Sequence, residues 1–347
     1  MTGSYNTGLG FATALAVSSV VTDVLRKKSL YENDLYSVSF WLRTVTTLCF
    51  GAALGLQLFQ HNLPALHSAG PLFGIAGADW PASAQFVIYL LLDTAMVALA
   101  LVFYLRALQT SELSYFLPFM SLTPALLIPT GFLLIGEVPK PHQIAGVLLI
   151  VAGSLAMNSQ HLGQGVLRVL AAPFEKEASR NALWAALLFA LSNPVDKIVV
   201  RMSQPVLYAF SYSLALTAFF AALMYCKGSV GRQPLSRTWH WIAAAGAVDA
   251  LALLLQFNAY RYLDVSLVIA IKRGGVILSV LAGWLIFRES KIADKLFATA
   301  IMAGGMLLIY LPGSRVEDAL FTIAGLAAFG VRMWWHRRKV PGATFNV

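Results

Sequence analysis

Two adjacent positive charges, Lys272 and Arg273, lie within the otherwise apolar stretch IAIKRGGVIL, residues 269–278. A charge at the centre of a lipid bilayer costs at least about 2.5–3.5 kcal/mol, so such side chains usually face water, a charged partner or a ligand. An ammonium and a guanidinium together suit a carboxylate or a phosphate. The pair therefore predicts a binding site for a substrate with an anionic group. We expect Gln256 to line the site, together with Gly275, which lies three residues from Lys272 on the same helix face.

Two acids, Asp93 and Asp249, fall at a similar depth within other apolar segments. Carboxyl groups at membrane depth carry protons in many pumps and transporters, so both acids are candidate coupling residues. The alternative is a structural cluster in which they only neutralise Lys272 and Arg273. Arg43, in a further apolar segment, is interpreted as a structural or gating residue.

These charges are exceptional, because 58% of the 347 residues are hydrophobic and only 12% are charged. Soluble domains carry roughly 25% charged residues, so the composition predicts an all-α polytopic membrane protein. A weaker apolar run over 319–335 is either an eleventh span or an amphipathic surface helix. Ten stronger runs can each cross the ~30 Å hydrocarbon core: 8–25, 36–59, 85–106, 113–136, 143–159, 182–202, 205–226, 239–261, 265–287 and 294–312.

The ten stronger spans form an internal repeat. Residues 101–158 can be laid on 253–310 without a gap, so that Glu137 meets Glu289 and Asp93 falls one helical turn from Asp249. Ser19 and Asp23 align more loosely with Ser192 and Asp196. Five helices are an odd number, so the second copy must enter the membrane from the opposite side. We predict two inverted five-helix repeats, residues 8–159 and 182–312, followed by an extension over 313–347.

The segment from Leu105 to Asn158 resembles the fourth and fifth helices of an EamA-type repeat of the drug/metabolite transporter superfamily. The features that carry this resemblance are Thr123-Pro124, Gly136-Glu137 and the Gly-bearing closing helix. The second copy is similar through Glu289 and Gly305 but lacks the Thr-Pro pair. The resemblance implies a ten-helix transporter of small metabolites and leaves the substrate open.

Residues that weaken helices occur at corresponding positions of the two copies. Thr123-Pro124 in the first copy falls beside Gly274 and Gly275 in the second, which is typical of transport sites. Pro194 is expected to break the sixth span just before Asp196. Pro124, Gly274 and Pro194 are therefore candidate hinge residues. Glu137 and Glu289 are expected to cap the helices that follow them.

The Lys and Arg residues favour one orientation, because excess basic residues mark cytoplasmic loops. The loops after even-numbered spans carry few of them. This predicts the inner (plasma) membrane, with an outside N-terminus and, if the eleventh run spans, a cytoplasmic C-terminus. The loops after odd-numbered spans carry Arg26, Lys27, Lys28, Arg106, Arg168, Lys176, Arg180, Lys227, Arg232, Arg237, Arg288, Lys291 and Lys295.

We expect a secondary transporter that moves a small polar metabolite with an anionic group by alternating access, driven by a proton or substrate gradient. Export is favoured over uptake on the family resemblance alone. The alternative is a flippase for a lipid or lipid-linked phosphate headgroup. An intramembrane aspartyl protease is disfavoured because neither Asp93 nor Asp249 lies in a Gly-x-Gly-Asp motif. The expected partners are the substrate and the bilayer, with a homodimer as one option; no enzyme activity, cofactor, metal or nucleic acid is expected.

Overall fold

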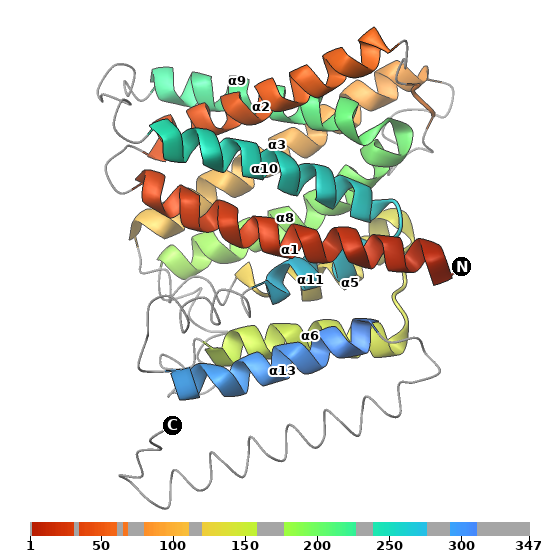
Figure 1. Cartoon of the computed structure of the whole chain (residues 1–347), viewed down its shortest axis with the longest axis vertical. Coiled ribbons are helices and arrows are strands. Elements are labelled where there is room, and N and C mark those ends of the chain that lie inside the picture. Colours follow the sequence, from red (N-terminus) through yellow and green to blue (C-terminus); the bar gives the residue numbers. More distant parts are fainter. Residues whose placement is uncertain are drawn as a thin grey trace, which may run out of the picture.

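The computed structural model describes residues 2–30, 35–60, 65–68, 80–110, 120–157, 177–226, 239–275 and 292–310. Every regular element within these residues is a helix, which confirms the predicted all-α class (Figure 1). The predicted eleventh run over 319–335 and the acid Glu289 lie outside the described residues. The helices are α1 (Thr2–Leu30), α2 (Leu35–Phe59), α3 (Ala82–Thr110), α5 (Thr123–Ile135), α6 (Pro141–Met157), α8 (Glu177–Met202), α9 (Pro205–Cys226), α10 (Trp239–Tyr260), α11 (Val265–Gly274) and α13 (Ile292–Tyr310).

The described helices have the length and surface of membrane spans. Six of them, namely α1, α2, α3, α8, α9 and α10, are long and apolar enough to cross a bilayer. The helices α5 and α6, together with the 300–310 part of α13, are shorter and also apolar. Large apolar side chains such as Leu48 and Leu133 are about two-thirds exposed, as expected for surfaces that contact lipid tails. These features confirm a multi-pass membrane protein.

The pattern of helix contacts stays the same when the two halves of the chain are exchanged. Helix α1 packs against α10, and α3 packs against α8, so the first helix of each half contacts the third helix of the other. Helix α2 packs against α9, and α6 packs against α13, which pairs corresponding helices with each other. In Figure 1 the α6–α13 pair lies to one side of the other helices, and α5 and α11 lie between this pair and the rest of the bundle.

The α6–α13 pair depends on two glycines at its crossing. A Cβ atom on Gly146 would lie 2.6 Å from the carbonyl oxygen of Gly305, and a Cβ on Gly305 would lie 2.6 Å from that of Gly146. Backbones approach this closely only when neither residue has a side chain. The Tyr5 hydroxyl of α1 donates to the Ile309 oxygen at 2.7 Å and accepts from Gln143 at 3.0 Å, so it ties α1 to this pair.

The long spans predicted over 113–136 and 265–287 are not described as continuous helices. Ser121 and Leu122 form a turn before α5 begins at Thr123, and α11 ends at Gly274 with Gly275 in a turn. Residues 111–119 and 276–291 lie outside the described residues. Pro124 lies in the first turn of α5, where the missing N–H of proline has no cost. The turn before α5 and the end of α11 fall at corresponding positions of the repeat.

The predicted break at Pro194 is wrong, because α8 continues from Glu177 to Met202 through this residue. A proline inside a helix removes the hydrogen bond to the carbonyl four residues earlier, here Ala190. The Thr130 hydroxyl of α5 donates to the Ala190 oxygen at 2.7 Å and so satisfies that carbonyl. A polar side chain on a neighbouring helix therefore lets Pro194 remain within α8.

The close crossing of α6 and α13 can be tested with a single methyl group. We expect Gly305→Ala to destabilise the protein by about 1–3 kcal/mol, because the new Cβ meets backbone atoms that cannot rotate away. Gly55→Ala is the matched control, since a Cβ there meets nothing within 4 Å. Thermal unfolding in detergent compares the two. Equal melting temperatures would show that the glycine contact does not determine the packing of this pair.

Candidate functional site

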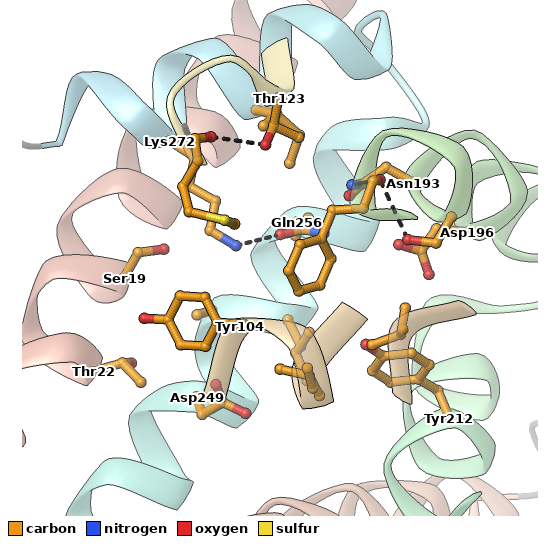
Figure 2. A pocket seen from close by; sticks show the side chains of 18 of the residues that line it. Ser19, Thr22, Tyr104, Thr123, Asn193, Asp196, Tyr212, Asp249, Gln256 and Lys272 are labelled. Carbon is orange, nitrogen blue, oxygen red and sulfur yellow. Dashed lines mark hydrogen bonds between the residues drawn. The ribbon is translucent and has the colours of Figure 1, made fainter. Parts of the chain in front are cut away.

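A cavity of about 220 Å³ lies between helices of both halves of the chain. In Figure 2 side chains from α1, α8, α10 and α11 point into it. Four cations and two acids are among the described residues that line it, so this described lining carries an excess of positive charge even with both acids ionised. The lining residues are Ser19, Thr22, Arg26, Arg43, Val97, Leu101, Tyr104, Met120, Thr123, Phe189, Ser192, Asn193, Asp196, Tyr212, Asp249, Ala252, Leu253, Gln256, Ile269, Lys272 and Arg273.

The structure brings together four of the residues singled out in the sequence. Lys272, Arg273, Gln256 and Asp249 all line the cavity. The Lys272 ammonium donates a 2.9 Å hydrogen bond to the Gln256 side-chain oxygen, so an amide positions this cation (Figure 2). Both Lys272 and Arg273 lie in the last turn of α11, where positive charge is favourable next to the negative end of the helix dipole.

The two glycines after this pair do not line the cavity. A Cβ on Gly275 would lie 2.8 Å from the carbonyl oxygen of Ala16 in α1. A Cβ on Gly274 would lie 2.6 Å from the sulfur of Met306 in α13. Their lack of side chains lets the end of α11 pack closely against α1 and α13.

Asp249 is held by two arginines. The Arg43 guanidinium donates to it at 2.9 Å, and Arg26 lies 3.5 Å from its second oxygen. The Thr46 hydroxyl approaches the same carboxylate at 3.4 Å. The negative charge of Asp249 is thus compensated by α1 and α2, and the lysine and arginine of α11 are not needed to neutralise it.

Asp93 has a different environment. It lies behind the cavity wall, is fully buried, and accepts a 2.8 Å hydrogen bond from the Tyr208 hydroxyl. The same hydroxyl contacts Asp196, which does line the cavity and is itself buried. The two carboxyl groups therefore meet at one hydroxyl group. Asp93 therefore has an acid as its neighbour, whereas Asp249 has two arginines.

Three residues of these groups, Asp196, Tyr208 and Arg26, were not predicted as site residues from the sequence. A signal for Asp196 was present, because it aligns with Asp23 in the internal repeat. Nothing in the sequence indicated Tyr208, which is one of several aromatic residues in an apolar helix.

A second group of charges, Glu137, Lys197, Arg201 and Asp264, lies where α5 and α8 end and α11 begins. We call it the outer charge cluster, because the orientation predicted from the Lys and Arg residues would place it outside. Lys197, which is 2% exposed, forms an ion pair with Glu137 and donates to the Leu263 oxygen at 2.5 Å. Arg201 lies 3.8 Å from Glu137. Burial and the negative charge of Glu137 raise the pKa of Asp264 above its ordinary value, against the opposing effect of Lys197 and Arg201.

Glu137 also caps a helix, although not the one expected. Its carboxylate accepts a 2.9 Å hydrogen bond from the backbone N–H of Val265, the first residue of α11. The prediction that it would cap the following helix is therefore wrong. The outer charge cluster connects the end of α5 in the first half to the start of α11 in the second.

Apolar helices around a cavity lined by charged side chains define the class of this protein as a polytopic membrane protein. Residues 181–311 match the model of the EamA-like transporter family. This match confirms the resemblance and supports membership of the drug/metabolite transporter superfamily, whose EamA-like members are transporters. The family thus implies a membrane transporter.

Solved structures support the fold. A chain known from a crystal structure is similar over 91% of this chain and 99% of its own length, with a TM-score of 0.67 and 17% sequence identity. At that identity the likeness concerns the fold alone. No curated protein matches the chain.

The role of Asp249 can be tested through its arginines. We expect Asp249→Asn to destabilise the protein by about 3–5 kcal/mol, because it leaves two cations facing each other without a counter-charge. Adding Arg43→Gln should restore part of the loss, since one cation is then removed. Thermal unfolding in detergent measures both variants. The assignment would be contradicted if the double variant were less stable than Asp249→Asn alone.

Proposed function

We propose that the protein is a secondary transporter of the inner membrane, moving a small polar metabolite with an anionic group by alternating access. The observation that carries this proposal is the cavity between the two halves, whose described lining has four cations and two acids. A cavity in an apolar protein with excess positive charge is most stable when an anion occupies it.

The two ends of the cavity differ in a way that fits one state of a transport cycle. With the orientation predicted from the Lys and Arg residues, Arg26 at the end of α1 and Tyr104 near the end of α3 lie towards the cytoplasm. The outer charge cluster lies on the opposite side. We therefore assign the structure to an inward-facing state in which the ion pair between Glu137 and Lys197 holds the outer ends of α5, α8 and α11 together.

The exchange symmetry of the helix contacts supports two moving halves. We propose residues 8–159 and 182–312 as these halves. A fold whose halves can swap conformations has an outward-facing state that is related to the inward-facing one by the same exchange. The turn at Ser121–Leu122 before α5 and the turn at Gly275 after α11 lie beside the cavity, at corresponding positions of the two halves. We propose that Pro124 and Gly274, next to these turns, act as hinges, and that Pro194 allows α8 to bend.

Exchange assays in proteoliposomes test this function. Vesicles loaded with a mixture of labelled amino acids, short carboxylic acids and sugar phosphates should exchange at least one anionic metabolite. If the vesicles exchange none of them but move a fluorescent anionic phospholipid between leaflets, the protein is a flippase and the proposal of a metabolite transporter is wrong.

The cation pair should determine affinity for the exchanged metabolite. We expect Lys272→Gln and Arg273→Gln each to raise the metabolite concentration at half-saturation by roughly 10–100-fold. This is the range for the loss of one charge-assisted hydrogen bond of about 1.5–3 kcal/mol. Arg273→Lys should recover only part, because lysine lacks the bidentate fork. Lys140→Gln is the control, since Lys140 lies outside the cavity lining. Unchanged half-saturation in both cavity variants would exclude these residues from the binding site.

A further inference from the structure

We propose that Asp93, Asp196 and Tyr208 form a proton-binding site at the wall of the cavity. These residues come from three different helices, α3, α8 and α9, so the bundle itself assembles the site. Its role in coupling rests on the proposed transport function, whereas its occupancy by a proton does not.

The group of Asp93, Asp196 and Tyr208 has too few hydrogen-bond donors for its acceptors. The Tyr208 hydroxyl contacts both carboxyl groups, yet it has one hydrogen to donate. The other oxygen of Asp93, Oδ1, is buried and has no hydrogen-bond partner among the described residues. An acceptor without a donor in the protein interior is costly, and two carboxylates that approach the same hydroxyl repel each other strongly when both are ionised. One proton held between Asp93 and Asp196 removes both costs.

Among the described residues, the counter-charge that faces the acid pair is Lys272, which lines the cavity together with Asp196. Helix α9 adds Tyr212, and α10 adds Tyr260, whose hydroxyl donates to Asn193 at 2.6 Å. Arg43 and Asp249 form an ion pair with each other elsewhere in the cavity lining. The described part of α5 contains no titratable residue. Lys272 of α11 acts on Asp196 and is the cation that connects the acid pair with the cavity.

A proton fits this site better than a metal ion. In the part of the chain that the structure describes, no three His, Cys, Asp or Glu side chains come close enough together to ligate a metal. The Tyr208 hydroxyl already occupies the space between the two carboxyl groups. The corresponding acid of the other half, Asp249, is neutralised by arginines and needs no proton.

Lys272 links this proton to the substrate. An anion bound in the cavity pairs with the Lys272 ammonium, whose charge otherwise compensates Asp196. Binding of the anion therefore favours protonation of the acid pair. By linkage, protonation strengthens binding of the anion by the same factor. The proton and the anion would then travel together, which favours uptake over the export suggested by the family resemblance.

Infrared spectroscopy of the purified full-length protein in detergent tests the proton directly. The wild type at neutral pH should show the band of a protonated carboxyl group, which shifts in heavy water. Asp93→Asn should remove this band, because its amide can donate to Asp196 and replace the proton. Glu177→Gln, which removes an exposed carboxyl group in the first turn of α8, should retain it. A wild type without the band, or a band that survives in Asp93→Asn, would overturn the proposal.

Two further measurements keep the test decisive. Tyr208→Phe keeps the ring and removes the hydroxyl, so the band should persist at a shifted frequency; an unshifted band would overturn the bridging role. Loss of the wild-type band on adding sodium at fixed pH would identify a metal cation as the occupant and would also overturn the proposal. These spectra need no transport, so they are independent of whether the exchange assay succeeds.

Discussion

The compensation of charge inside an apolar bundle is the constraint on which the rest of this structure depends. A lone charge in such an interior is costly, so each buried ionic group must have a partner, water or a proton. Asp249 has Arg26 and Arg43, and Glu137 has Lys197. Asp93 has Asp196 and a tyrosine hydroxyl. These three solutions correspond to three proposed roles: a fixed wall of the cavity, an outer closure and a proton site.

The two halves share their packing but not their charges. The contacts of α1 with α10 and of α3 with α8 exchange when the halves are swapped, so Asp249 and Asp93 occupy related places. One place has arginines from α1 and α2, and the other has an acid from α8 and a tyrosine from α9. A symmetric backbone with asymmetric side chains can move in two equivalent ways while it binds the proton on one side and the anion on the other.

Much of the fold could be predicted from the sequence, because the length and polarity of a segment determine whether it can cross a bilayer. The same argument places Lys272, Arg273 and Asp249 at a similar depth, and they share the cavity with Gln256. Depth does not determine the direction in which a side chain points. Gly275 therefore lies against α1 instead of the cavity, and the partners Asp196, Tyr208 and Arg26 emerged only when the helices were packed. The Pro194 break was wrong because the compensating Thr130 lies on another helix.

Cysteine accessibility tests the central claim, that the cavity faces the cytoplasm and is closed on the outside by the outer charge cluster. In a background without Cys49 and Cys226, Ser19→Cys reports on the cavity and Ser266→Cys on the buried start of α11. A membrane-impermeant maleimide should label Ser19→Cys from the cytoplasmic side only, and Ser266→Cys from neither side. Adding Glu137→Gln should expose Ser266→Cys to label from outside. Labelling of Ser19→Cys from outside in the unaltered protein would contradict the account.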